Sequence, residues 1–224
     1  RVCAIRSNGL SASERELLSR IRIGNMRRKV TTRNVSVNIA KVVTIACLLV
    51  LPVFYPITTR AAVYLGMHLS YCVWYLLKQG ILEEPVFREQ DSILDVLMVI
   101  TSVGVFYVLP GWLAFTNSQP VSNLVLALSV VLFFFGSVVN SSADVQKSTA
   151  LKLQQGLITG GFWRLSRNIN YFGDLIRYSA FALLAGSLWA WSVVLFVLVV
   201  DLDRMRKKST SLSRYPDYQA YRTN

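Results

Sequence analysis

The chain has 224 residues, of which 53% are hydrophobic, and carries 24 Lys and Arg against 12 Asp and Glu, for a net charge of +12. An apolar body with a basic surface is the profile of a multi-pass membrane protein. A single histidine excludes a histidine-cluster metal site, and Cys3, Cys47 and Cys72 lack the paired spacing that would indicate a zinc site or a disulfide framework.

Residues 1–36 form a basic N-terminal arm that contains nine Arg and Lys. Within it we expect a short amphipathic helix over 13–23, with one apolar side and one basic side. Such a helix suits the surface of an anionic membrane, and a basic tail docked on another protein fits the pattern equally well. The chain begins at Arg1 rather than Met, from which we expect a processed or truncated N-terminus.

The remainder, 37–224, is expected to be a single all-α membrane domain. About 30 Å of hydrocarbon takes roughly 20 helical residues to cross. Apolar runs of that order lie at 37–57, 60–78, 93–116, 121–141 and 171–203. The last run is too long for one span, and the small residues at 185–187 predict a tight hairpin in its middle. The fold class is therefore a polytopic helical bundle with about six transmembrane helices.

An even number of spans places both termini and the connections at 79–92 and 142–170 on one face of the membrane. Of the 24 basic residues only Arg60 falls at the opposite face. This bias is the one that orients membrane helices. It explains the net charge without a nucleic-acid partner, and we expect an organellar membrane (mitochondrial inner, plastid or endoplasmic reticulum) and contact with membrane lipids.

The connection at 142–170 carries four basic side chains against the single carboxylate of Asp144. A pocket built from it would be positive, which suits phosphates or anionic lipid headgroups. The next helix begins with Asp174 and Arg177, whose spacing puts both on one helical face where they can pair. Ionisable groups at membrane depth are costly and tend to mark function.

Three motifs in this part of the chain resemble those of the steroid 5-alpha-reductases and the related sterol C14 reductases. Residues 161–174, GFWRLSRNINYFGD, are similar to the family signature G-W-R-x-S-R-H-P-N-Y-F-G-E. Residues 144–147, DVQK, are similar to its D-x-Q-K stretch, and residues 214–221, RYPDYQAY, to its closing K-Y-G-x-x-W-x-x-Y. The isoprenylcysteine carboxyl methyltransferases, more distant relatives, share a variant of the central motif. The resemblance covers 142–224.

The resemblance implies a membrane-embedded bundle whose loops close over NADPH and direct its nicotinamide toward a lipid-like enone such as a sterol, steroid or isoprenoid. It assigns the cofactor to one group of side chains, with Arg204 as an additional candidate: Lys147, Arg164, Arg167, Asn170, Tyr171, Asp174, Arg204 and Tyr215. Tyr71 resembles the family's proton-donating tyrosine, and His68 lies three residues before it. These two are the candidate catalytic residues, and no metal is implied.

The chain departs from the family pattern at several positions. Asp174 replaces a glutamate, Asn168 and Ile169 replace a histidine and a proline, and the range 207–208 holds two lysines where the family has an acidic pair. No Asp or Glu lies between Glu16 and Glu83, so the early-span glutamate of the steroid reductases has no counterpart except His68 or Tyr71.

Three functions are therefore open at this point. The first is reduction of a carbon–carbon double bond in a lipid by NADPH or NADH. The second is a non-catalytic accessory subunit of a larger organellar membrane complex, respiratory or photosynthetic, with other membrane subunits as partners. The third is a methyltransferase that uses S-adenosylmethionine on a lipid or a prenylated protein.

Overall fold

The computed structural model describes residues 31–82, 90–153 and 156–223, so the predicted amphipathic helix at 13–23 lies outside the described residues. The described chain is helical apart from two short strands, β1 (Thr31–Thr32) and β2 (Gln90–Asp91), which pair antiparallel. Nearby, the Arg33 guanidinium donates to Asp91 over 2.6 Å and joins the start of the first helix to β2.

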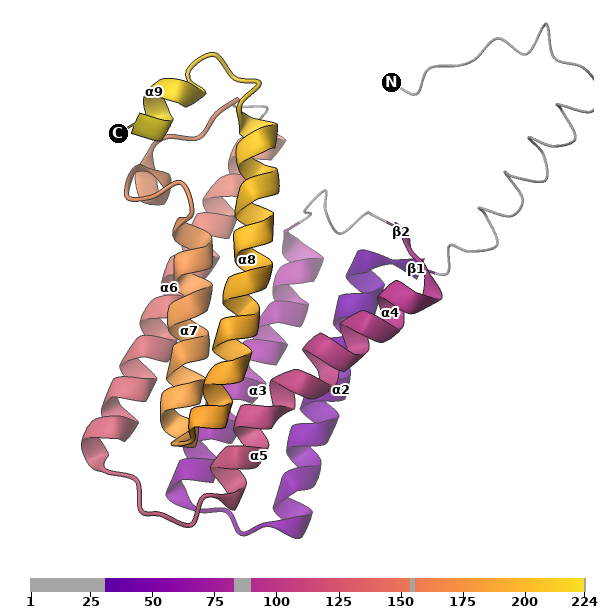
Figure 1. Ribbon diagram of the computed structural model, residues 1–224, viewed down its shortest axis with the longest axis vertical. Helices are drawn as coiled ribbons and strands as arrows, with labels where there is room; N and C mark the ends of the chain where they lie inside the picture. Colours follow the sequence, from indigo (N-terminus) through magenta and orange to yellow (C-terminus); the bar gives the residue numbers. More distant parts are fainter. Residues whose placement is uncertain (1–30, 83–89, 154–155, 224) are drawn as a thin grey trace, which may run out of the picture.

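The helices follow one another with short connections, and Figure 1 shows most of them running along the long axis of the molecule. In chain order they are α2 (Arg33–Phe54), α3 (Thr59–Ile81), α4 (Ile93–Val99), the π-helical segment η2 (Ile100–Val105), the 3₁₀ segment η3 (Phe106–Val108), α5 (Leu109–Thr116), α6 (Asn123–Lys152), the 3₁₀ turn η4 (Gly161–Arg164), α7 (Ile169–Ala185), the 3₁₀ turn η5 (Leu188–Ala190), α8 (Trp191–Leu212) and α9 (Tyr218–Thr223).

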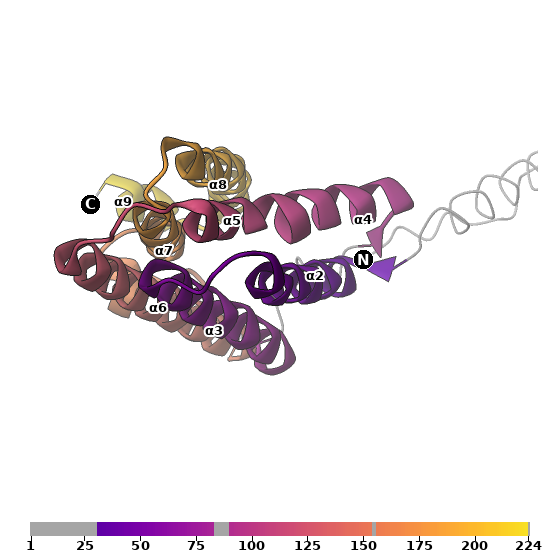
Figure 2. The ribbon, with the colours of Figure 1, turned by 90° about the horizontal axis from the view of Figure 1, so that it is seen from below.

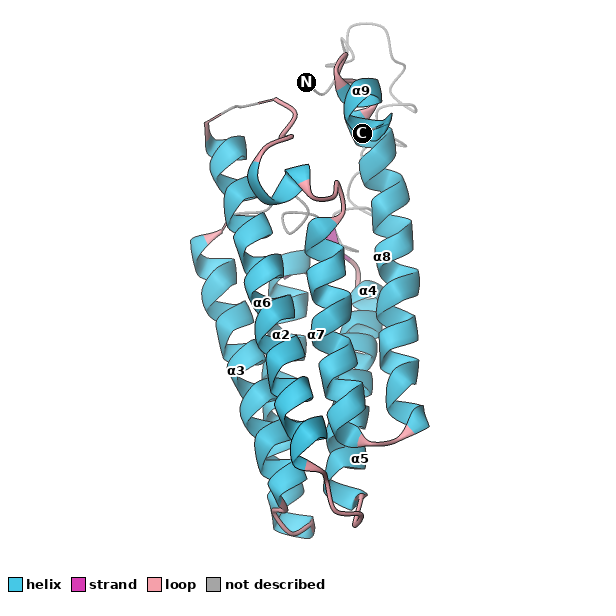
Figure 3. Cartoon of the chain, turned by 90° about the vertical axis from the view of Figure 1, so that its left-hand side faces the viewer, coloured by secondary structure: helices cyan, strands magenta, loops and turns pink. Residues whose placement is uncertain are grey.

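Three helical stretches of the described chain are long and apolar enough to cross a membrane: Arg33–Phe54, Ile93–Thr116 and Asn123–Lys152. α3 and α7 run beside α6, and α8 runs beside α7, as Figure 3 shows, and α3 lies between α6 and α2 when the bundle is seen along its axis (Figure 2). The protein is therefore an all-α, multi-pass membrane protein. The count of six spans remains a prediction.

The two ends of the bundle differ in what they carry. The turns that join α2 to α3, α5 to α6 and α7 to α8 lie at the lower end in Figure 1, whereas α9 and the β1–β2 pair lie at the upper end. The predicted hairpin at 185–187 is present. Gly186 ends α7 with a φ of +66°, a left-handed conformation that favours glycine.

The stretch Ile93–Thr116 is distorted in its middle, where α-helical geometry gives way to η2 and then η3. Pro110 provides a cause, because it has no N–H to donate and its ring collides with the carbonyl four residues earlier. Thr44 of α2 lies beside the distortion, with its hydroxyl 3.0 Å from the Val103 carbonyl and 3.1 Å from that of Gly104. Tyr107, whose side chain is buried, lies in η3 at the end of the distorted stretch.

For the fourth predicted span, 121–141, the predicted C-terminal end is too early. α6 continues to Lys152, so Asp144 and Lys147 lie on a helix rather than in the expected loop at 142–170. The reason is local: residues 142–152 contain neither Gly nor Pro and include several strong helix formers, so nothing stops the helix.

α6 and α7 approach each other closely at two glycines. A Cβ atom built on Gly136 would lie 2.6 Å from the Gly173 carbonyl oxygen and 2.7 Å from the Arg177 amide nitrogen. A Cβ on Gly173 would lie 2.7 Å from the Asn140 amide nitrogen. Small residues of this kind let the backbones of membrane helices touch.

We expect Gly136→Ala to force the two helices apart and to destabilise the protein by about 1–3 kcal/mol, the usual cost of overpacking. The measurement is the thermal unfolding midpoint of the purified protein in detergent. Gly66→Ala in α3 is the matched control, because no atom lies within 4 Å of the added methyl group. Equal midpoints for the two variants would contradict the close packing of α6 and α7.

Candidate functional site

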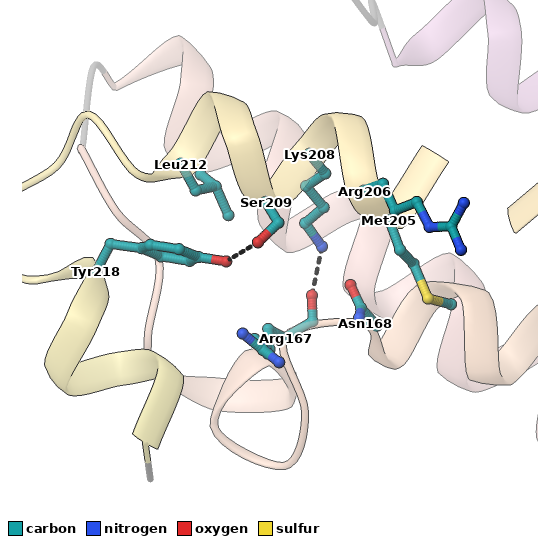
Figure 4. Close-up of a pocket in the computed structure, with 8 residues that line it drawn as sticks. All are labelled: Arg167, Asn168, Met205, Arg206, Lys208, Ser209, Leu212 and Tyr218. Carbon is teal, nitrogen blue, oxygen red and sulfur yellow. Dashed lines mark hydrogen bonds between the residues drawn. The ribbon is translucent and has the colours of Figure 1, made fainter. Parts of the chain in front are cut away.

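A basic pocket lies at the upper end of the bundle, where the C-terminal part of the chain folds back over η4. The Lys208 ammonium donates to the Arg167 carbonyl oxygen, as drawn in Figure 4, and lies 4.2 Å from the centre of the Trp163 ring. The Tyr221 hydroxyl donates to the Trp163 carbonyl over 2.5 Å. These contacts join the end of α8 and α9 to the segment between α6 and α7.

The pocket has a volume of about 170 Å³. Its lining combines three cationic side chains with polar and apolar ones: Arg167, Asn168, Met205, Arg206, Lys208, Ser209, Leu212 and Tyr218. Tyr218 is 2% exposed, and its hydroxyl lies 2.7 Å from the Ser209 hydroxyl (Figure 4). Sites for drug-sized ligands usually span roughly 300–1,000 Å³, so this pocket fits one phosphate group rather than a whole dinucleotide.

A second pocket of about 170 Å³ adjoins the first and shares Asn168 and Met205 with it. Its walls are largely apolar, with Phe172 and Leu175 from α7 and Leu198 from α8, and Tyr171 and Asp201 are the larger polar side chains. Asp201 is buried and its Oδ2 atom has no hydrogen-bond partner among the described residues. The first pocket therefore offers cations that can bind an anionic group, and the second offers an apolar slot beside it.

Polar side chains continue from this end into the seam between α6 and α7. The Asn140 side-chain amide donates to the Asn170 carbonyl over 3.0 Å, and the Arg177 guanidinium donates to Asn140 Oδ1 over 3.5 Å. Asp174 pairs with Arg177, as the sequence predicted. In the same layer the Lys78 ammonium donates to Asp144 over 2.5 Å. Asn140, Asp174 and Asp144 therefore each have a hydrogen-bonded or oppositely charged partner.

The candidate catalytic residues lie deeper in the bundle, on α3. The Tyr71 hydroxyl is 2.8 Å from the Tyr178 hydroxyl of α7 and accepts a hydrogen bond from the Lys41 ammonium of α2 over 3.3 Å. The Arg177 guanidinium lies 4.3 Å from the centre of the Tyr71 ring. Tyr71 therefore lies between the polar contacts of the α6–α7 seam and the buried core of the bundle.

His68 is 1% exposed and lies about one helical turn before Tyr71 in α3. Its Nδ1 atom is 2.9 Å from the Tyr64 hydroxyl, its ring stacks on Phe181 at 4.6 Å between centres, and its Nε2 atom has no partner among the described residues. It has no direct contact with Tyr71 beyond neighbouring rings, whose centres are 6.1 Å apart. The position of His68 therefore supports a catalytic role less well than the position of Tyr71 does.

The structure brings some of the cofactor candidates together and leaves others apart. Arg167, Asn170, Tyr171 and Asp174 line the two pockets or the seam below them. The Arg164 and Arg204 side chains are exposed. Tyr215 lies near Gly156 instead of in a pocket. Lys147 is half-buried, and it lies near enough to Lys208 for its positive charge to lower the pKa of Lys208.

Sequence reasoning missed Tyr218, which lines the basic pocket in place of Tyr215, and it missed Lys41 and Tyr178. Lys41 had a signal that could have found it: it is the only charged residue between Arg33 and Arg60. An ionisable group inside a span costs roughly 2.5–3.5 kcal/mol on insertion scales and usually faces a cavity or partner. Tyr178 had no such signal.

Lys208 lies beyond the predicted span, which ends at residue 203. The pKa of its ammonium group leads to a prediction about stability and pH. Burial, with the Lys147 ammonium as a second cause, lowers the pKa of Lys208 to about 7. Between about pH 7 and pH 10.5 the unfolded chain then binds more protons at this site than the folded one, so stability rises with pH across that window. We expect Lys208→Met to remove this rise in unfolding midpoint. Parallel pH profiles for the two proteins would contradict the assignment.

The comparisons with known proteins agree with the position of these motifs. A family model described as "Protein of unknown function (DUF1295)" matches residues 81–224, which is more than half of the chain and includes both pockets and the seam. No curated protein matched the chain. The chain therefore belongs to the DUF1295 family of membrane proteins, a family of unknown function that is related to the steroid 5-alpha-reductases.

Proposed function

We propose that this protein is a membrane-embedded reductase that uses NADPH or NADH to reduce a carbon–carbon double bond in a sterol, steroid or isoprenoid-like lipid, within a six-span bundle of the steroid-reductase type. The observation that carries the proposal is an arrangement along α7. The basic pocket lies at the upper end of this helix, Asp174 and Arg177 pair farther down it, and Arg177 lies against the ring of Tyr71, whose hydroxyl meets that of Tyr178. This arrangement joins a phosphate-binding end to a buried proton donor.

The basic pocket supports the cofactor part of the proposal. Arg167 and Arg206 present guanidinium groups, which bind phosphate oxygens in pairs, and Lys208 adds a point charge. The adjoining apolar slot would hold a flat ring at the top of α7. A nicotinamide cofactor, when bound, supplies the hydride.

The position of Tyr71 supports the second part of the proposal, the reduction of a double bond. Reduction of a polarised double bond needs a buried group that gives up a proton while the hydride is accepted. Tyr71 is 6% exposed, and its hydroxyl lies within hydrogen-bond distance of both the Lys41 ammonium and the Tyr178 hydroxyl. The surrounding helices exclude bulk water from this hydroxyl.

The rival proposal, a non-catalytic accessory subunit, is favoured by one specific observation. Lys208 replaces an acidic residue of the family pattern, and its ammonium is engaged with the Arg167 carbonyl and the Trp163 ring. These internal contacts hold the C-terminal segment over η4. A scaffold that retained the fold for assembly with other membrane subunits would keep such contacts.

We expect the full chain in lipid nanodiscs to bind NADPH in a calorimetric titration, and Arg167→Ala to weaken binding about tenfold or more, because hydrogen bonds to charged groups are worth roughly 1.5–3 kcal/mol. Arg222→Ala is the matched control, since Arg222 is an exposed arginine on α9. Equal loss in both variants would indicate only a general charge effect. No binding of either nucleotide would favour the accessory subunit, and binding of S-adenosylmethionine instead would favour a methyltransferase.

We further expect a lipid enone in the same nanodiscs to accelerate NADPH oxidation, and Tyr71→Phe to slow the reaction about 100-fold or more, the usual range for loss of a general acid. The measurement is nicotinamide absorbance with product analysis of the lipid. The substitution keeps the ring, so unfolding midpoints should match those of the unsubstituted protein. Turnover that survives Tyr71→Phe unchanged would remove Tyr71 from the reaction.

A further inference from the structure

Lys41 is a buried lysine to which neither the motifs nor the proposed function assign a role. It lies in the first described span, α2, and is 1% exposed. Within the described ranges no carboxylate pairs with it. The Lys41 ammonium instead hydrogen-bonds to the Tyr71 hydroxyl and lies over three tyrosine rings, those of Tyr71, Tyr75 and Tyr107, at 4.5, 5.2 and 5.1 Å from their centres.

This cage is built by three separate parts of the bundle. α2 provides the lysine, α3 provides Tyr71 and Tyr75, and the distorted stretch around η3 provides Tyr107. The π-helical segment just before η3 packs on α2 at Gly104, where an added Cβ would lie 3.3 Å from the Ala40 carbonyl. π-helical turns inside longer helices are frequent at functional sites. The distortion therefore supports a role for the cage beyond packing.

Tyr71 faces one excess positive charge. On the α2 side it meets Lys41, and on the α7 side the Arg177 guanidinium, whose own charge is balanced by Asp174. Its other titratable neighbours are neutral groups: Tyr178 of α7 and His68 and Tyr75 of α3. The Lys41 ammonium is therefore the charge that faces the Tyr71 hydroxyl without a carboxylate partner among the described residues.

We propose that Lys41 is the positioning residue for proton donation by Tyr71. The inference rests on the proposed function and adds to it. Lys41 holds the Tyr71 hydroxyl next to Tyr178 and supplies the counter-charge for the phenolate that proton donation leaves behind.

The substrate of this step has a double bond conjugated to a carbonyl group. The β-carbon accepts a hydride from the reduced nicotinamide, and the electron pair of the double bond moves toward the carbonyl oxygen. The Tyr71 O–H bond breaks, its proton passes to that oxygen, and the phenolate remains against the Lys41 ammonium. The resulting enol becomes the saturated carbonyl compound when a proton moves from its oxygen to the α-carbon. As the product leaves, a proton from solvent restores the phenol, and Lys41 stays charged throughout. A substrate that develops positive charge would be disfavoured beside Lys41.

The test compares Lys41→Met, which removes the charge and keeps the length, with Lys41→Arg, which keeps the charge. In nanodiscs with NADPH and a lipid enone we expect Lys41→Met to lower kcat about 100-fold, the typical loss for a preorganised electrostatic group. We expect KM and the NADPH dissociation constant to stay within about twofold, and Lys41→Arg to recover much of kcat. A fall in KM and kcat together, without recovery by arginine, would mean that Lys41 acts only in packing.

A second readout needs no turnover. In infrared spectra of the nucleotide-free protein, we expect the phenol C–O band of one tyrosine to shift in Lys41→Met, because that substitution removes a hydrogen-bond donor to Tyr71. The difference should vanish when both proteins also carry Tyr71→Phe. Identical spectra would overturn the inference even if the protein is a reductase, whereas a shifted band without any turnover would count against the proposed reaction alone.

Discussion

The contact between α6 and α7 at Gly136 and Gly173 is the constraint on which the rest of the structure depends. The two backbones meet so closely that neither position has room for a Cβ. Because the helices touch, the Asn140 amide can reach the Asn170 carbonyl at the first turn of α7, and Arg177 can reach Asn140. The register of α7 against α6 is thereby set, and with it the positions of Asn170, Asp174 and Arg177 in the seam and of Tyr171 in the second pocket.

Buried charge is the second organising factor. Charges in an apolar bundle are stable only when they are paired or hydrogen-bonded. Lys78 has the carboxylate of Asp144 and Arg177 has that of Asp174. Lys41 has tyrosine rings and one phenol instead. Tyrosine can satisfy an ammonium through its ring face and its hydroxyl while it packs like phenylalanine, which explains why the interior around α3 is rich in tyrosine.

The C-terminal segment links this interior to the membrane surface. α8 extends beyond the bundle, and its contacts from Lys208 to Arg167 and Trp163 hold the segment over η4. Of the two lysines at 207–208, Lys208 lines the basic pocket together with Arg167 and Arg206, whereas Lys207 is exposed and pairs with Asp203. Cationic side chains of this kind can bind an anionic group.

Hydropathy and charge in the sequence alone determined that the chain is all-helical and membrane-embedded, with its basic connections at one end. Local spacing also determined the hairpin at Gly186 and the pair of Asp174 and Arg177, since both depend on residues that are adjacent or one turn apart. Only the tertiary structure decided that Lys41 meets Tyr71 and that Tyr71, 107 residues from Tyr178, shares a hydrogen bond with it. Those contacts depend on the depth and rotation at which helices pack, which side-chain volumes across an interface set and which no local pattern encodes.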